Sequence, residues 1–154
     1  MNMPDNSRRT LLKGAAAAVA AVGTVNAQTK PAQTTPAKKV YRSGPKPPTP
    51  PAYSTAVSYG SLLFVSGMIY RQEGDIKVQT ESVMNDIQKQ LEAAGSSMEK
   101  VLKCNVFLAN IKDLPAMNEV YTGKFGGDPP ARTTVAVSGI PANSLIEMDV
   151  VAYI

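Results

Sequence analysis

Apolar residues recur at regular spacings only in the part of the chain that follows residue 52. Two short apolar runs within residues 56–67 flank Tyr59, Gly60 and Ser61, and this pattern predicts a β-hairpin. A further short strand is expected at residues 75–78, after the polar Glu-Gly pair.

The next segments alternate between helical and strand-like periods. Residues 80–94 predict an amphipathic helix that ends at Gly95, with one apolar face made of Val83, Ile87, Leu91 and Ala94. Residues 113–125 predict a second helix, capped by Asp113 and followed by two glycines, with Pro115 in its first turn and Met117, Tyr121 and Phe125 on one side.

Three apolar runs complete the pattern as strands, at residues 101–108, 132–137 and 145–154. The order strands, helix, strand, helix, strands predicts an α+β fold. Residues 62–65 and 104–108 are apolar on both faces, whereas two helices can cover only one side of a sheet. We therefore expect a homo-oligomer in which a second subunit covers the other side.

The first 27 residues have the pattern of an export signal. Basic residues near Arg8 and Arg9 precede a short Ala-rich run, and small residues ending at Ala27 suit a signal peptidase. The run is about half of the roughly 20 apolar residues that a spanning helix needs. The order Ser-Arg-Arg-Thr-Leu-Leu-Lys resembles the twin-arginine signal, so a periplasmic protein cleaved near Ala27 and free of the membrane is expected.

Residues 28–52 are rich in proline, threonine and lysine, which predicts an extended, disordered linker before a domain at 53–154. The linker and signal carry the basic charge of the chain. From Tyr53 onward eight cations face eleven anions, a net charge of −3. Nucleic acid is therefore not an expected partner of the folded domain.

The composition also removes several kinds of catalytic site. The chain has no histidine, which excludes histidine triads, histidine general bases and histidine metal ligands. Its one cysteine, Cys104, lies among alternating apolar residues and is expected to be a buried, inert thiol. Carboxylates are not clustered at metal-ligand spacing, so neither a metal nor another cofactor is expected.

Six runs between Pro51 and Tyr153 together resemble one known family. They read PPAYSTAV, LLFVSGMI, LEAAGSSMEKVLKCNVFL, MNEVY, PPARTTVAV and LIEMDVVA, in this order. The chain resembles the RidA/YjgF family of enamine/imine deaminases. The resemblance implies a chorismate-mutase-like fold, a mixed sheet with two helices on one face. It also implies a homotrimer with active sites between neighbouring subunits, which hydrolyses small 2-imino acids such as 2-iminobutanoate, or enamines such as 2-aminoacrylate, to 2-oxo acids and ammonia.

Arg132 and Glu147 carry the predicted chemistry. By resemblance, Arg132 binds the substrate carboxylate, for which a planar guanidinium with two parallel donors is well suited. The other interpretation of Arg132 is a strand-end residue that faces water or pairs with Asp128. Glu147, by resemblance, contacts the attacking water, while Asp149 is structural; otherwise both are solvated carboxylates.

Four further residues are expected near the substrate. Backbone groups at Gly67 and Thr134 are expected to hold it closely. Tyr53 borders the pocket by resemblance, or else closes the sheet edge as an aromatic plug. Asn118 lies near the subunit contact by resemblance, or else makes a hydrogen bond on the helix surface.

Several positions depart from the family pattern. Pro51 and Ala52 stand where Gly-Pro is usual, Met68 replaces a polar amide, Tyr70 adds bulk, and residues 71–78 form a shorter loop. We therefore expect an altered side-chain preference. A non-catalytic trimer that binds small carboxylates is the alternative function. A holdase acting through exposed apolar surface has only Met68 and Tyr70 in its favour.

Overall fold

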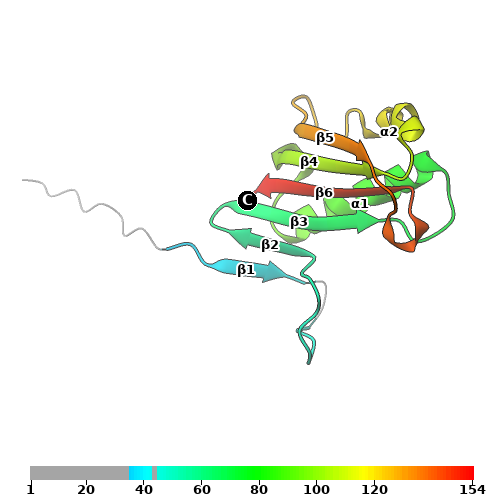
Figure 1. Ribbon diagram of the computed structural model, residues 1–154. Coiled ribbons are helices and arrows are strands. Elements are labelled where there is room, and N and C mark those ends of the chain that lie inside the picture. The colour runs from blue at the N-terminus through cyan, green and yellow to red at the C-terminus, as the bar shows by residue number, and fades with distance from the viewer. Residues whose placement is uncertain (1–34, 43–44) are drawn as a thin grey trace, which may run out of the picture. The chain divides into compact units, whose positions relative to one another are not determined.

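The computed structural model describes residues 35–42 and 45–154, which include one mixed six-stranded sheet (Figure 1). The strand order is β1-β2-β3-β6-β4-β5, and all neighbours are antiparallel except β4 and β5. The strands are β1 (Lys38–Tyr41), β2 (Ala56–Tyr59), β3 (Leu62–Ile69), β4 (Val101–Leu108), β5 (Ala131–Ala136) and β6 (Ile146–Tyr153). The two α-helices are α1 (Ile76–Ala93) and α2 (Leu114–Tyr121). The α+β prediction is confirmed.

The predicted hairpin is formed by β2 and β3. Tyr59 pairs with Leu62 across the turn, and Gly60 takes a φ of 60°, which glycine adopts at little cost. β3 then pairs with the central strand β6, and a bulge between Val65 and Met68 interrupts this ladder.

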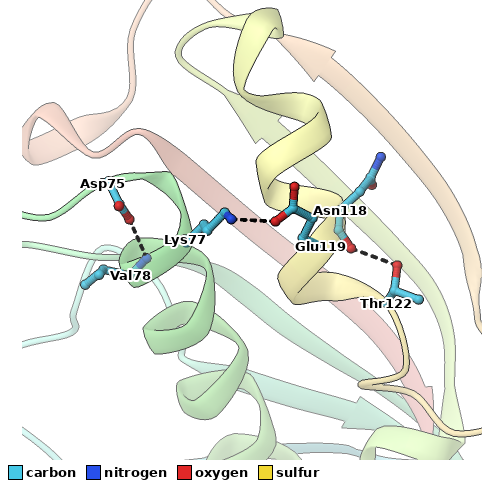
Figure 2. Close-up of polar contacts among 6 residues, drawn as sticks. All are labelled: Asp75, Lys77, Val78, Asn118, Glu119 and Thr122. Atoms are coloured by element: carbon cyan, nitrogen blue, oxygen red, sulfur yellow. Dashed lines mark hydrogen bonds and ion pairs between the residues drawn. The ribbon is translucent and has the colours of Figure 1, made fainter.

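The strand expected at residues 75–78 is wrong, because the first helix begins there. Asp75 caps α1, and its Oδ1 accepts a hydrogen bond of 2.9 Å from the Val78 amide (Figure 2). Ile76 is buried on the same face as Val83 and Ile87, so the apolar period extends one turn earlier than expected. The helix ends as predicted before Gly95, which has a φ of 83°.

The second helix is shorter than its apolar pattern predicted. α2 ends at Tyr121 because Thr122 adopts an extended conformation, and the amide and hydroxyl of Thr122 donate to the Asn118 carbonyl at 3.0 and 2.7 Å (Figure 2). Asp113 makes no side-chain capping bond, so that part of the prediction is wrong. An ion pair between Lys77 and Glu119 joins α1 to α2.

Both helices pack on one face of the sheet, as predicted. α1 lies behind the sheet in the view of Figure 1, and Met117 and Tyr121 of α2 belong to the same buried core. Cys104 is fully buried there, and burial raises the pKa of its thiol to about 11. The predicted burial of this thiol is therefore confirmed.

The opposite face of the sheet is covered by neither helix. Phe64, Val135 and Tyr153 lie on it and are each about two-fifths exposed, at 43%, 42% and 42%. Within the described ranges, no helix combines the length and apolar character needed to span a bilayer.

Strand β1 corrects the expectation of a linker over residues 28–52. Lys38–Tyr41 pairs with β2, and the Tyr41 hydroxyl lies 3.3 Å from Ser58 Oγ. A predominantly polar segment becomes a strand here because the free edge of β2 supplies its hydrogen bonds. The predicted signal at 1–27, and the linker residues 28–34 and 43–44, lie outside the described residues.

Candidate functional site

The residues predicted to form the site lie on both faces of the sheet. Arg132 pairs in the parallel ladder with Cys104, which is fully buried beneath the helices. Glu147 lies between Ile146 and Met148, both fully buried, so its side chain points to the uncovered face. Within one chain the sheet therefore separates Arg132 from Glu147.

Arg132 lines a hollow at the C-terminal end of α2. The cavity has a volume of about 630 Å³, and its walls come from α2, the following loop and the start of β5. The guanidinium carbon of Arg132 lies 4.6 Å from the centre of the Tyr121 ring. The Tyr121 ring in turn lies 5.0 Å from the ring of Phe125. The stacked aromatic ring holds the flat guanidinium over the hollow by a cation–π contact.

The charge of Arg132 has no anionic partner among the described residues. The ion pairs there all use lysine: Lys77–Glu119, Lys89–Asp86 and Lys124–Glu81. Asp128, the partner considered from the sequence, makes no ion pair with Arg132. The N–H groups of the Arg132 guanidinium are thus available to donate hydrogen bonds to a ligand in the hollow.

Asn118 is brought to the same hollow, whereas Thr134 is not. Asn118 lines the cavity, and Figure 2 shows its side chain pointing away from the Lys77–Glu119 pair. Thr134 follows Arg132 by two residues on β5 but does not line this cavity, and its buried hydroxyl makes no hydrogen bond. The expectation that Thr134 contacts the substrate has no support in the lining of the hollow.

Glu147 lines a second, smaller hollow of about 300 Å³ on the uncovered face. Tyr53 and Gly67 line it too, as the sequence predicted, together with Ser66, Ile69, Arg71 and Pro141. Gly67 lies in the bulge of β3. A Cβ atom on Gly67 would lie 1.9 Å from Glu147 Oε1, so only glycine leaves room for the carboxylate. The Glu147 carboxylate therefore lies close to the backbone of β3.

Among the described residues that line these two hollows, Glu147 is the carboxylate. Burial raises the pKa of Tyr121 well above its usual range, and the pKa of Cys104 is also raised. Both groups therefore stay protonated at neutral pH and cannot accept a proton there. In the described part of the chain, no three Cys, Asp or Glu side chains gather as a metal site.

Sequence reasoning missed the roles of Tyr121 and Arg71. The spacing of Tyr121 and Phe125 predicted packing, but α2 and β5 meet only in the folded chain, where Arg132 stacks on Tyr121. Arg71 was noted only as the start of a short loop. The sequence feature that could have pointed to Arg71 is a single basic residue directly after an apolar strand.

Comparisons with known proteins agree with this geometry. The model of the family described as endoribonuclease L-PSP matches residues 44–154, and the model of the twin-arginine translocation signal sequence matches residues 5–25. A RutC family protein of Pyrococcus abyssi is 43% identical over 116 residues, which cover 71% of this chain and 90% of that protein. Protein DfrA of Myxococcus xanthus is 37% identical and covers 75% of this chain and 95% of its own length.

Solved structures are similar as well. The Rid-family protein YyfA of Yersinia pestis, described as of unknown function, superposes with a TM-score of 0.70 at 33% identity, covering 77% of this chain and 100% of that one. TdcF of E. coli, solved with bound serine, gives a TM-score of 0.67 at 25% identity over 75% of this chain and 98% of that one. Because the family model, the relatives and the fold agree, this chain belongs to the endoribonuclease L-PSP family, which includes the RidA, YjgF and RutC proteins, and it carries a twin-arginine signal sequence for export.

Proposed function

We propose that the protein hydrolyses small 2-imino acids, and the enamines that tautomerise to them, to 2-oxo acids and ammonia. The observation that carries this proposal is the unpaired guanidinium of Arg132, held on the Tyr121 ring over a hollow. A planar guanidinium binds a carboxylate through two parallel hydrogen bonds, which fix both the position and the orientation of a small acid.

The binding mode has support from a relative. TdcF of E. coli was solved with serine, a small molecule whose carboxylate is attached to the carbon that bears nitrogen. A 2-imino acid has the same arrangement of carboxylate, carbon and nitrogen. In the proposal Arg132 binds that carboxylate, and the Asn118 amide supplies a further polar contact from the same hollow.

Glu147 supplies the proton transfers. The protonated imine is electrophilic at C2, where a water molecule adds while Glu147 takes its proton. Glu147 then returns a proton to the nitrogen. As the C–N bond breaks, Glu147 takes the proton of the new hydroxyl group, so that ammonia leaves and a 2-oxo acid remains. The reaction consumes one water and involves no oxidation, so positioning and acid–base help are sufficient.

A complete site requires two copies of the chain. Arg132 and Glu147 lie on opposite faces of one sheet, so one small molecule contacts both only where a second subunit supplies the missing half. The uncovered face exposes Phe64, Val135 and Tyr153, which favours its burial in an assembly. We propose the homotrimer that the resemblance implies, with one site at each contact between subunits.

The export signal supports a periplasmic location for the proposed reaction. Imino acids form there if an oxidase acts on amino acids, because its oxidant takes a hydride from the α-carbon and the nitrogen loses a proton, which leaves a C=N bond. An exported deaminase would then hydrolyse the reactive imine where it is made.

The proposal is tested by ammonia release from 2-iminobutanoate generated in situ, measured above the uncatalysed rate. We expect Arg132→Ala to lower kcat/KM by about 100-fold or more, because the charged hydrogen bonds to the carboxylate are lost. Glu147→Gln is expected to lower kcat by about 100-fold or more, through loss of the proton acceptor.

The matched controls Lys112→Ala and Asp149→Asn remove one cation and one carboxylate elsewhere. Asp149 accepts a hydrogen bond from Asn105. Equal rates with and without the wild-type protein would contradict the proposal.

The alternative is a trimer that binds small carboxylates without catalysis. Arg132 and its hollow favour it, because they form a carboxylate site that does not need Glu147. Calorimetry that shows 2-oxobutanoate binding, lost in Arg132→Ala, together with no acceleration of imine hydrolysis, would support this alternative. Ribonuclease activity is not proposed, because residues 53–154 carry a net charge of −3 and the chain has no histidine.

A further inference from the structure

Arg71 is a second arginine placed beside the predicted chemistry. It follows β3 and lines the hollow of Glu147 together with Tyr53 and Gly67. The geometry points to Arg71 as a specificity residue that binds a second acidic group, so that the preferred substrates are dicarboxylic 2-imino acids. This inference rests on the proposed function and names its substrate class.

The backbone on both sides of Arg71 is anchored. The Tyr70 amide donates to Ser144 Oγ at 3.3 Å, and the Tyr70 hydroxyl donates to Gln72 Oε1 at 3.3 Å. Ser144 Oγ in turn donates to the buried Gln79 Oε1 at 3.1 Å, and the Gln79 amide nitrogen donates to the Gly74 carbonyl at 3.0 Å. These bonds tie the loop after β3 to α1 and to the segment before β6. The backbone of Arg71 is therefore held in place, which lowers the backbone entropy lost when a ligand binds there.

The guanidinium of Arg71 has no anionic partner among the described residues. No carboxylate oxygen there lies within 4.0 Å of it, although Glu73 is two residues away and Glu147 lines the same hollow. In contrast, the lysines at positions 77, 89 and 124 form ion pairs with carboxylates. Like Arg132, Arg71 is an arginine without an ion pair that lines a hollow. Its guanidinium can bind a carboxylate through two hydrogen bonds.

The order of groups around the hollow indicates which part of a substrate meets Arg71. In the proposed reaction the carboxylate next to C2 binds Arg132 of one copy, and C2 lies beside Glu147 of another. The substrate side chain then occupies the remainder of the Glu147 hollow, whose lining includes Arg71. An acidic group at the end of a short side chain places its charge there, whereas an alkyl side chain leaves the cation solvated.

The test compares two imines made in situ by amino-acid oxidases, 2-iminoglutarate and 2-iminobutanoate. We expect the wild-type protein to prefer 2-iminoglutarate in kcat/KM by about tenfold or more, as charged hydrogen bonds imply. Arg71→Gln is expected to lower kcat/KM for 2-iminoglutarate by about 10-fold to 100-fold, and to change it less than about 3-fold for 2-iminobutanoate. Arg71→Glu is expected to reverse the preference. The matched control is Arg42→Gln, because Arg42 lies outside the Glu147 hollow.

The outcomes separate this inference from the proposed function. Equal losses on both imines in Arg71→Gln, or no loss on either, would overturn the role of Arg71 while leaving the deaminase intact. If neither imine is hydrolysed, calorimetry with 2-oxoglutarate and 2-oxobutanoate decides. Weaker binding of 2-oxoglutarate alone in Arg71→Gln supports the dicarboxylate site, and unchanged binding of both acids rejects it.

Discussion

The hollow of Arg132 and the hollow of Glu147 each include an arginine, but they differ in size and in their other lining residues. The first is larger, at about 630 against 300 Å³, and is built around the aromatic rings of Tyr121 and Phe125. The second contains the Glu147 carboxylate, which lies close to the backbone at Gly67. One is suited to holding an anion and the other to moving a proton. In the proposed function, a single chain therefore carries two half-sites, and hydrolysis requires both.

Mixing two inactive variants gives the largest expected effect. Arg132→Ala and Glu147→Gln each destroy one half-site, so each alone has little activity. After the two proteins are denatured together and refolded as mixed trimers, about one quarter of the sites pair an intact arginine with an intact glutamate, which restores about a quarter of the wild-type rate. Ammonia release before and after mixing measures this recovery.

In the control, each variant alone is denatured and refolded by the same procedure. A mixture that stays as inactive as its parents would show that the two hollows do not meet across subunits.

Gly67→Ala breaks the Glu147 half-site without changing any polar group. Its Cβ would lie 1.9 Å from Glu147 Oε1, so the carboxylate has to move. Because a displaced base transfers protons poorly, we expect kcat to fall by about 100-fold. Gly139→Ala is the matched control, since a Cβ at Gly139 meets nothing within 4 Å. If Gly67→Ala keeps the wild-type kcat, the position of Glu147 is unimportant for the rate.

Tyr121 tests how the Arg132 half-site is held together. Tyr121→Leu removes the ring beneath the guanidinium of the exposed Arg132, so we expect KM to rise by about two- to fivefold, the size of a cation–π contact at an exposed site. Tyr121→Phe keeps the ring and removes a buried hydroxyl that makes no hydrogen bond, so KM and stability should stay close to wild type. Steady-state kinetics and thermal melts of both variants are the measurements. A rise in KM as large for phenylalanine as for leucine would assign the effect to the hydroxyl.

Cys104 gives the smallest effect, confined to alkaline pH. Burial raises the pKa of the folded thiol to about 11 from an ordinary value of 9.0. Between these values the unfolded chain releases a proton that the folded chain retains, so the free energy of unfolding falls as pH rises from 9 to 11. The loss attributable to this thiol reaches about 2 to 3 kcal/mol. Urea unfolding of the wild type and of Cys104→Ala, at pH 8 and at higher pH, measures this fall in the free energy of unfolding. An equal pH dependence in both proteins would contradict the role of the thiol.

Much of the fold followed from local patterns. The β2–β3 hairpin, the central run of α1 and strands β4, β5 and β6 appear where apolar spacing predicted them. The errors lie at the helix ends and in strand β1, which was expected to be linker. α1 starts earlier because Asp75 caps it, and α2 stops at Tyr121 because Thr122 adopts an extended conformation. Such ends depend on one or two hydrogen bonds, which periodicity does not encode.

The sequence by itself determined the order of the elements, the family, the export signal and the choice of Arg132 and Glu147, because each of these is written in residues close together along the chain. Only the tertiary structure decided that these two residues face opposite sides of the sheet, that Tyr121 supports Arg132, and that Arg71 shares a hollow with Glu147. The physical reason is that side chains distant in sequence meet through ladder register and helix packing. Both depend on contacts across the whole core rather than on local propensity.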